Sequence, residues 1–494
     1  MIALVLCAVF AVSYVVGKSL HNLFFHPLRR VPGHWPWIAF PLLRHISAVR
    51  GNVDLDIKRW HERYGPVVRF SPDEVSFITS EAWNEIYGRH DRRHSLPKSM
   101  FSNSNTADII NANDRDHARY RKALAHGFST KGVREQEPMI RRHIDKLVAQ
   151  LQSFADTRQP ADLVTWYRLT TFDIIGDLAF GEHFGGLDQG HYHPWVAFMM
   201  RYTRLIPFFK AMDAYPVIFR TAFAFMSASS QAITEQMRYS QALVHKRIHS
   251  VPLSGQGRPD FVDSIMRQQG TKNEMSQLEI EANASVIIIA GSETPADLLC
   301  AVTYWLLRTP EVLLRVRDEL RDAVTTSADI TFHAVATKLP LLTACLNEAL
   351  RLYPSVPGGL QRVTVSPITL SGVTIPSNTQ VGLHQFAAYT SPSNFHRPES
   401  FLPQRWDPEV INNPASPFYN DNREVFQPFS AGPRNCIGKN LAYAIMRTTL
   451  ARVLWEFDLE LCSESEDWHV QKTYGLWDKK PLLCQLRRGE GQGN

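Results

Sequence analysis

The chain has 494 residues, of which 44% are hydrophobic, and a formal net charge of +5. This length supplies a large core, and the mild positive charge comes without a long Lys/Arg run, so the sequence predicts no nucleic-acid partner. Its six cysteines are thinly spread and include no Cys-x-x-Cys pair, which argues against a disulfide framework and a zinc site and favours a reducing compartment.

The N-terminus begins with an uncharged and mostly apolar segment, Met1 to Val16, and basic residues come only after it. A helix of this length reaches roughly 24 Å, and Gly17 with a snorkelling Lys18 can extend it across a bilayer. Basic residues on the C-terminal flank place the rest of the chain on the cytosolic side. We therefore expect residues 1–17 to form a single membrane anchor.

The next segment, residues 18–36, contains His26-Pro27 and Pro32-Gly33, which break helices and predict a hinge. Residues 37–494 are then expected to form one single domain. Within it, residues 54–64 have a helical pattern, whereas residues 67–70 and 75–78 have strand patterns. Further along the chain, helical patterns dominate residues 114–250, and strand signals return near residues 363–364, 373–375 and 481–483. The balance predicts a mainly α fold with a small β part.

A long ordered loop is expected at residues 391–435, which carry many Pro, Asn and Ser residues. Its aromatic side chains favour a loop that packs against the body rather than a disordered one. They are Phe395, Phe401, Trp406, Phe418, Phe426 and Phe429.

His117 and Arg121 lie four residues apart in a helical segment, so they share one face of the helix. Both side chains can donate hydrogen bonds to an anionic ligand. The alternative is an ordinary basic face in contact with solvent.

The longest expected helix runs from Ser276 to about Arg308, and Ser276-Gln277-Leu278-Glu279 fits a capping box. It contains Ala290-Gly291-Ser292-Glu293-Thr294-Pro295. Because Pro295 has no N–H, the carbonyl of Gly291 loses its usual partner, and the helix should bend or open beside Thr294. The alternative is a simple kink where two helices pack.

Prolines bracket the segment from Pro340 to Pro354, which predicts a helix between them. Glu348 and Arg351 are three residues apart on one face of that helix. Their apolar neighbours favour a buried pair, which would need further partners, whereas a solvated pair is the generic alternative.

Cys436 follows a turn rich in Gly and Pro, in the run Phe429-Ser430-Ala431-Gly432-Pro433-Arg434-Asn435-Cys436-Ile437-Gly438. A helical pattern starts just after it, so a thiolate there faces free N–H groups at a helix start. Gly432 and Gly438 leave room for a flat ligand, and Arg434 can pair with a nearby carboxylate. The alternative is a half-buried structural cysteine.

This pattern, Phe-x-x-Gly-x-Arg-x-Cys-x-Gly, resembles the haem-binding loop of the cytochrome P-450 family. Ala-Gly-x-Glu-Thr resembles the oxygen-binding helix of that family, and Glu-x-x-Arg and Phe401-Leu402-Pro403-Gln404-Arg405-Trp406 match two more of its motifs in the same order. The resemblance covers nearly the whole chain and implies the cytochrome P-450 fold, with a long distal helix across the haem.

The resemblance also implies roles for single residues. Cys436 would be the axial thiolate ligand of the haem iron, and Glu293 with Thr294 would relay protons for oxygen activation. Arg405 would join Glu348 and Arg351 in a structural cluster that holds the loop carrying Cys436. The other residues expected to bind the cofactor are Phe429, Arg434, Arg121, Arg362 and His117, which stands where relatives carry tryptophan.

The implied function is a haem-thiolate monooxygenase that uses haem b (iron protoporphyrin IX) and O₂ to oxidise an apolar small molecule. NADPH-cytochrome P-450 reductase would supply the electrons, with cytochrome b5 as a second candidate donor, at the endoplasmic reticulum membrane. A haem-thiolate isomerase or dehydratase and a non-catalytic haem sensor are the alternatives. The intact Glu293-Thr294 pair favours the monooxygenase.

Two segments, Leu23 to Leu28 and Asp116 to Arg119, look most like fungal microsomal members that hydroxylate or epoxidise secondary metabolites, such as trichothecene hydroxylases. By analogy, five regions would contact the substrate: residues 95–113, 195–226, Asn283 to Gly291, 355–361 and Tyr474 to Trp477.

Overall fold

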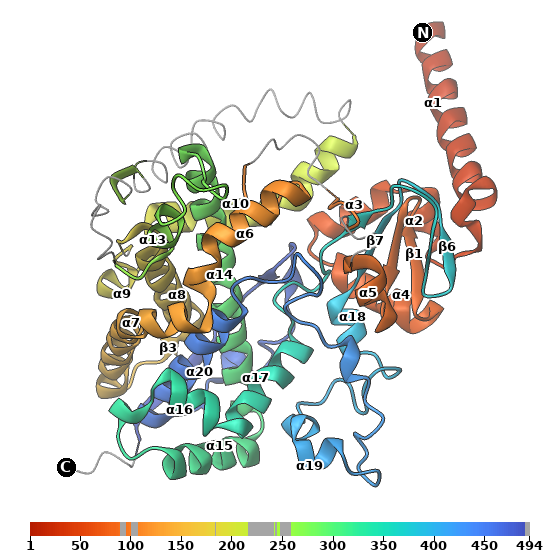
Figure 1. The fold of residues 1–494 in the computed structure, drawn as a ribbon. Helices are drawn as coiled ribbons and strands as arrows, with labels where there is room; N and C mark the ends of the chain where they lie inside the picture. The colour runs from red at the N-terminus through yellow and green to blue at the C-terminus, as the bar shows by residue number, and fades with distance from the viewer. Residues whose placement is uncertain are drawn as a thin grey trace.

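A computed structural model describes residues 1–88, 95–99, 107–182, 184–215, 242, 245–247 and 258–489. It is mainly helical with a small β part, as the sequence predicts. Figure 1 shows two regions, one containing most of the helices and the other built around a sheet next to the N-terminal helix. The long helix α14 (Gln277–Leu307) runs through the helical region.

The N-terminal helix α1 (Ile2–Leu20) projects from the body (Figure 1) and continues as a π-helical turn, η1 (His21–Phe25). The helical segment is therefore longer than the predicted anchor 1–17. It ends at His26, whose extended backbone is the conformation that a following proline favours.

Part of the predicted hinge is held against the body. The Ser19 hydroxyl donates a hydrogen bond to the carbonyl oxygen of Ala39 at 2.9 Å, and the Asn22 amide donates to Ile38 at 3.2 Å. Both side chains are buried. The helix is interrupted at His26 and again at residues 31–34, where Gly33 forms a β-bridge with Arg69.

The sheet region contains four strands in the order β1-β2-β7-β4. Strands β1 (Val67–Ser71) and β2 (Glu74–Phe77) form an antiparallel hairpin, and β2 pairs in parallel with β7 (Gln380–Leu383). Both strands of the hairpin are buried on both faces. The remaining elements of this region are η2 (Pro27–Arg30), α2 (Trp35–Ala39), α3 (Leu42–Val49), α4 (Val53–Tyr64), α5 (Glu81–Tyr87), β4 (Arg362–Val363), β5 (Ile368–Leu370), β6 (Val373–Ile375) and α18 (Gln385–Tyr389).

The helical region packs around α14, which contacts α8 (Leu163–Phe180), α17 (Pro340–Leu352) and α20 (Lys439–Glu456). The predicted capping box is present at its start, with Ser276 and Glu279 as partners. The other helices are α6 (Asp114–Phe128), α7 (Thr130–Thr157), α9 (Gly186–Gln189), α10 (Pro194–Ala214), α13 (Phe261–Met266), α15 (Pro310–Ala323), η3 (Ser327–Asp329) and α16 (Phe332–Thr337).

The predicted loop 391–435 contains only the short helices η4 (Pro403–Trp406), α19 (Pro408–Ile411) and η5 (Arg423–Val425). Three of its six aromatic side chains are buried, namely Phe395, Phe401 and Phe418, so the loop packs against the body as expected. The chain ends with β8 (Phe457–Leu461), η6 (Ser463–Ser465), β9 (Lys472–Thr473), β10 (Trp477–Asp478) and β11 (Leu483–Arg488); β11 lies between β8 and β3 (Ala161–Asp162).

Candidate functional site

The Cys436 loop makes a tight turn before α20. Ser430 and Gly432 both have positive φ angles, of 61° and 73°, and a Cβ on Gly432 would lie 2.0 Å from the carbonyl oxygen of Tyr87. Only glycine allows this close approach. The Cys436 N–H donates to the carbonyl of Phe429 at 2.9 Å and closes the loop.

The Cys436 side chain is exposed, yet the protein atoms packed around its sulfur desolvate it enough to raise the pKa of the thiol. Hydrogen bonds from the Gly438 and Lys439 N–H groups and the charge of Arg121 act in the opposite direction. The N–H groups at the helix start therefore stabilise the thiolate as expected, but burial has the larger effect on the pKa of Cys436. An accessible sulfur with N–H groups aimed at it can serve as an anionic ligand to a metal.

Helix α6 lies beside this loop and presents the two predicted residues to it. Arg121 donates to the backbone oxygen of Asn435 at 2.7 Å and to its side-chain oxygen at 2.6 Å, so it is held next to Cys436. His117 is buried, and burial followed by the charges of Arg434, Lys98 and Arg121 lowers its pKa to about 4. His117 is therefore neutral at physiological pH and does not belong to a solvated basic face.

Arg434 pairs with a carboxylate, as its position in the sequence predicts. Its Nε and Nη2 atoms donate to Asp114 Oδ1 at 3.0 and 2.8 Å, and Nη2 also donates to the Ala112 carbonyl at 2.6 Å. The remaining nitrogen, Nη1, is buried without a hydrogen-bond partner.

Arg362, on β4, is only 1% exposed and lies 5.2 Å from the centre of the Tyr87 ring. Its Nε and Nη1 atoms are also buried without partners. A buried cation that leaves donors unpaired is costly, and an anionic ligand would remove that cost. The unpaired nitrogens of Arg362 and Arg434 thus fit a ligand that carries carboxylates.

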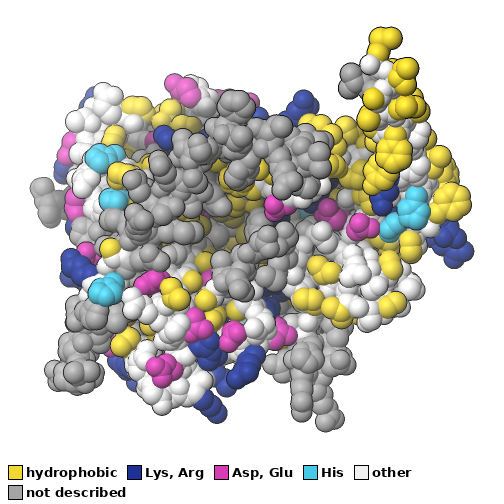
Figure 2. Space-filling model, turned by 90° about the horizontal axis from the view of Figure 1, so that it is seen from above, with side chains coloured by type: hydrophobic (Ala, Val, Ile, Leu, Met, Phe, Trp, Pro, Cys, Tyr) yellow, Lys and Arg dark blue, Asp and Glu magenta, His cyan; other side chains and the backbone are white. Residues whose placement is uncertain are grey.

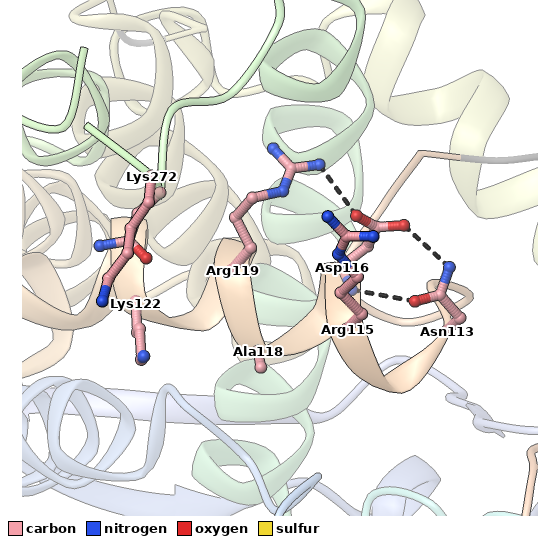
Figure 3. Close-up of a pocket in the computed structure, with 8 residues that line it drawn as sticks. Asn113, Arg115, Asp116, Ala118, Arg119, Lys122 and Lys272 are labelled. Atoms are coloured by element: carbon pink, nitrogen blue, oxygen red, sulfur yellow. Dashed lines mark hydrogen bonds and ion pairs between the residues drawn. The ribbon is translucent and has the colours of Figure 1, made fainter. Parts of the chain in front are cut away.

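Two pockets flank α6. One, of about 480 Å³, lies between the helix and the Cys436 loop and is lined by Asp114, His117, Arg121 and Arg434, among others. The other, of about 550 Å³, lies on the side of the helix that carries Arg115 and Arg119, and Lys272 lines it from a separate segment (Figure 3). No residue of the Cys436 loop lines this second pocket.

The Glu348 carboxylate lies at the centre of a buried polar cluster. It accepts hydrogen bonds from Arg351 at 2.8 and 3.0 Å, from Arg405 Nε at 3.0 Å, and from the Trp406 indole at 2.9 Å. Burial alone would raise the pKa of Glu348, but the charges of Arg351 and Arg405 and these hydrogen bonds hold it below its usual value. The structure therefore brings together the three residues that the motifs nominated, and it adds Trp406.

The distal segment of α14 differs from expectation, because the helix is continuous through Pro295. The Thr294 hydroxyl donates to the Ala290 carbonyl at 2.8 Å, and the Ser355 hydroxyl donates to the Thr294 carbonyl at 3.2 Å. A Cβ on Gly291 would lie 3.1 Å from Ile175 of α8, so the two helices pack closely at this point. That packing holds the segment in helical geometry.

Glu293 does not form a pair with Thr294 in this structure. Its buried carboxylate binds Lys479 at 3.0 Å and Arg168 at 3.1 Å, and Lys479 also binds Asp297. Burial alone would raise the pKa of Glu293, but these two cations hold it well below its usual value. The other oxygen, Oε1, has no partner.

Sequence reasoning did not find the partners of Glu293. Asp297, which binds the same Lys479, lies four residues after Glu293 on one helix face, and two acidic residues at this spacing were a usable signal of a shared cation. Arg168 and Lys479 come from α8 and from the C-terminal segment, and no local pattern marks them.

All five predicted substrate regions reach described cavities or contacts. The side-chain amide of Asn283 donates to the Ala107 carbonyl at 3.1 Å and accepts from the Ile109 N–H at 2.9 Å. A cavity of about 260 Å³ is lined by residues 358–362, Tyr474 and Gly475, with α3 and α10 on its other side. Residues 100–106 and 216–226 lie outside the described residues.

The comparisons with known proteins agree with this geometry. The family model of cytochrome P-450 matches residues 31–485. The chain is 57% identical to cytochrome P-450 monooxygenase olcB of Penicillium canescens, covering 96% of both chains. It is 48% identical to a trichothecene C-4 hydroxylase of Trichoderma arundinaceum, covering 95% and 94%, and 41% identical to an averantin hydroxylase of Dothistroma septosporum, covering 96% and 89%.

Proposed function

Because this chain belongs to the cytochrome P-450 family, whose members use haem, O₂ and electrons derived from NADPH, we propose that it is a monooxygenase that hydroxylates an apolar small molecule of fungal secondary metabolism. The observation that carries this proposal is the accessible Cys436 thiol, in the same loop as Arg434, together with the unpaired, buried guanidinium nitrogens of Arg434 and Arg362. One sulfur ligand and two anion-binding groups suit a haem with its two propionates.

In this proposal Cys436 binds the iron, and His117, Arg121, Arg362 and Arg434 hold the propionates. Phe429 packs against Tyr443 at the base of the loop, with the ring centres 5.2 Å apart. The haem, when bound, supplies oxygen activation and transfer of one oxygen atom to carbon.

The protein's own contribution on the distal side comes from α14. Thr294 can turn its hydroxyl from the Ala290 carbonyl to another polar group, because its side chain is partly exposed. Glu293 is a carboxylate at neutral pH, and its unpaired Oε1 can accept a proton and release it. We therefore assign proton transfer to Thr294 and, through a change in its pairing with Arg168 or Lys479, to Glu293.

The test of the function uses the full-length protein with NADPH-cytochrome P-450 reductase, NADPH and ¹⁸O₂, with extracts of a host that makes candidate precursors. We expect a product that carries one ¹⁸O atom and depends on NADPH. Product formed without NADPH would instead indicate an isomerase or dehydratase. Haem binding without any turnover across such precursors would favour a sensor.

Thr294→Ala is expected to retain haem but to waste electrons. Positioned proton donors contribute roughly 10²- to 10⁴-fold to a rate, so product per NADPH should fall to a small fraction while peroxide rises. Thr294→Ser keeps a hydroxyl at this position and should form as much product per NADPH as the wild type. Ser292→Ala is the matched control, because that hydroxyl is buried and donates to Thr171 of α8 at 3.3 Å. Wild-type coupling in Thr294→Ala would refute the assignment.

We also propose that the protein lies in the endoplasmic reticulum membrane with its catalytic domain in the cytosol. Val5–Phe25 is long and apolar enough to cross a membrane, and its side chains are largely exposed. Figure 2 shows the hydrophobic side chains that cover this helix. The second candidate span, Gln277–Leu307, is mostly buried in the core.

Deleting residues 1–16 should release much of the protein from membranes under an alkaline wash and leave its haem content unchanged. Ser19 and Asn22 remain, so the contacts with α2 persist. A deletion of residues 1–30 also removes Leu28, which is buried, and should lower the melting temperature. Full-length protein that washes off freely would refute the anchor, and a domain protected from protease inside sealed microsomes would refute the orientation.

A further inference from the structure

Lys98 lies in a short described segment, residues 95–99, that pairs with strand β4. The Val363 N–H donates to the carbonyl of Pro97 at 2.9 Å, and the Ser99 N–H donates to the carbonyl of Gln361 at 3.2 Å. An antiparallel β-bridge joins Lys98 to Arg362. Residues that face each other in such a bridge have their side chains on the same side, so the two cations share one face.

The charges around Lys98 are not balanced. Its Nζ donates to the carbonyl of Ile110 at 2.5 Å, and no ion pair joins it to a carboxylate in the described part of the chain. Lys98 and Arg362 line one cavity, whereas Arg434 lines the pocket beside α6. The only carboxylate that any of these three cations binds, again among the described residues, is Asp114, which already pairs with Arg434.

Burial, followed by the charges of Arg362 and Arg434, lowers the pKa of Lys98 to about 7, although Asp108 and Asp114 act in the opposite direction. The groups that α6 adds are the neutral His117 and the cation Arg121. Lys98, Arg362 and Arg434 therefore form a cation cluster that lacks an anion, and three of its buried guanidinium nitrogens have no partner.

We propose that Lys98 binds a haem propionate together with Arg362 and Arg434, as a further cofactor-binding residue of this chain. The inference rests on the proposed function for the identity of the ligand. The two propionates bring two negative charges to a cluster that otherwise holds repelling cations, and a charge-assisted hydrogen bond from Nζ would replace its bond to Ile110.

A consequence is that haem binding takes up a proton above neutral pH. The carboxylate raises the pKa of Lys98 from about 7 in the haem-free protein. At a pH between the pKa of Lys98 in the haem-free protein and its higher pKa in the haem-bound protein, the lysine must gain a proton when haem binds. The affinity for haem therefore falls as pH rises, by at most about tenfold per pH unit. An arginine at this position stays charged and removes this slope.

The first test measures haem transfer from the holoprotein to excess apomyoglobin by absorbance. We expect Lys98→Met to lose haem roughly 10- to 100-fold faster than wild type. Lys98→Arg should retain haem. The rate of haem loss from wild type divided by the rate from Lys98→Arg should grow as pH rises above about 7. The ionisation of Cys436 is common to both proteins and cancels in the ratio. Lys131→Met, at an exposed lysine of α7 that lines neither of these two cavities, is the control and should behave as wild type.

The second test repeats the transfer with haem dimethyl ester, whose propionates carry no charge. If Lys98 binds a propionate, wild type and Lys98→Met should lose the ester at the same rate. An equal difference with both ligands would show a structural role and overturn the proposal, as would equal haem loss from wild type and Lys98→Met. Wild-type protein that binds no haem would overturn the proposed function itself.

Discussion

Replacing Cys436 with serine is expected to abolish the thiolate-type absorption band of the reduced, CO-bound protein. Cys436 is the one described cysteine that lies in a Gly-rich turn before a helix, with the Gly438 and Lys439 N–H groups directed at its sulfur. A serine oxygen is a harder and less electron-donating ligand than a thiolate sulfur, so it cannot produce the thiolate-type band even where it binds the iron. The measurement is the difference spectrum of dithionite-reduced protein with and without CO.

The control for this experiment is Cys462→Ser, at a partly exposed cysteine next to β8. We expect an unchanged band in that variant, because Cys462 lies in no Gly-rich loop. Haem content should be measured in parallel by a pyridine haemochrome assay. Loss of the band without loss of haem would show that the substitution removed the iron ligand and not the cofactor. An unchanged band in Cys436→Ser would show that another group binds the iron.

Glu348→Ala is expected to yield little folded, haem-loaded protein. The side chains of Glu348, Arg351 and Arg405 are all 0% exposed. Removing the carboxylate leaves two guanidinium groups buried without their central partner, at a cost of roughly 3–5 kcal/mol. This is a large share of the 5–15 kcal/mol that is typical of protein stability.

The effect should extend to the Cys436 loop. Arg351 donates to three backbone carbonyls, those of Tyr389, Pro398 and Ser400, at 2.7, 2.5 and 3.0 Å. Arg405 binds Asp421 and the His396 carbonyl. The cluster thereby holds the long loop that leads to Cys436, and Arg351→Ala should lose haem as Glu348→Ala does.

Glu460→Ala is the matched control for this prediction. Glu460 pairs with Arg487 at 3.2 Å, but its side chain is 69% exposed. Surface pairs of this kind contribute little to stability. Circular dichroism melts and haem content in both variants give the measurement, and normal haem content in Glu348→Ala would contradict the assigned role of the cluster.

Much of the fold was predictable because its signals are local. The Ser276–Glu279 capping box, the Pro340–Leu352 helix and the β1–β2 hairpin depend on residues a few positions apart. The pairing of Glu348 with Arg351 also follows from helical spacing. Membership of the family followed from motifs in which residue types and spacings are both constrained.

Local patterns were misleading where packing decided the outcome. Pro295 predicts a helix that bends or opens, and α14 does not open: it stays helical through this point, where Gly291 packs closely against Ile175 of α8. The Pro/Gly content of residues 18–36 predicts a hinge, yet the buried side chains of Ser19 and Asn22 bind the backbone of α2.

The amino-acid sequence alone indicates the chemistry proposed for the chain: one candidate thiolate ligand, an acid next to a hydroxyl, and a set of basic side chains. Which partners these groups meet depends on how the chain packs in three dimensions. Lys479 reaches Glu293 across 186 positions, and the bridge between Lys98 and Arg362 brings distant segments together. Spacing along a helix specifies neighbours three or four residues away. Contacts between distant segments depend on how whole elements pack, which no short pattern encodes.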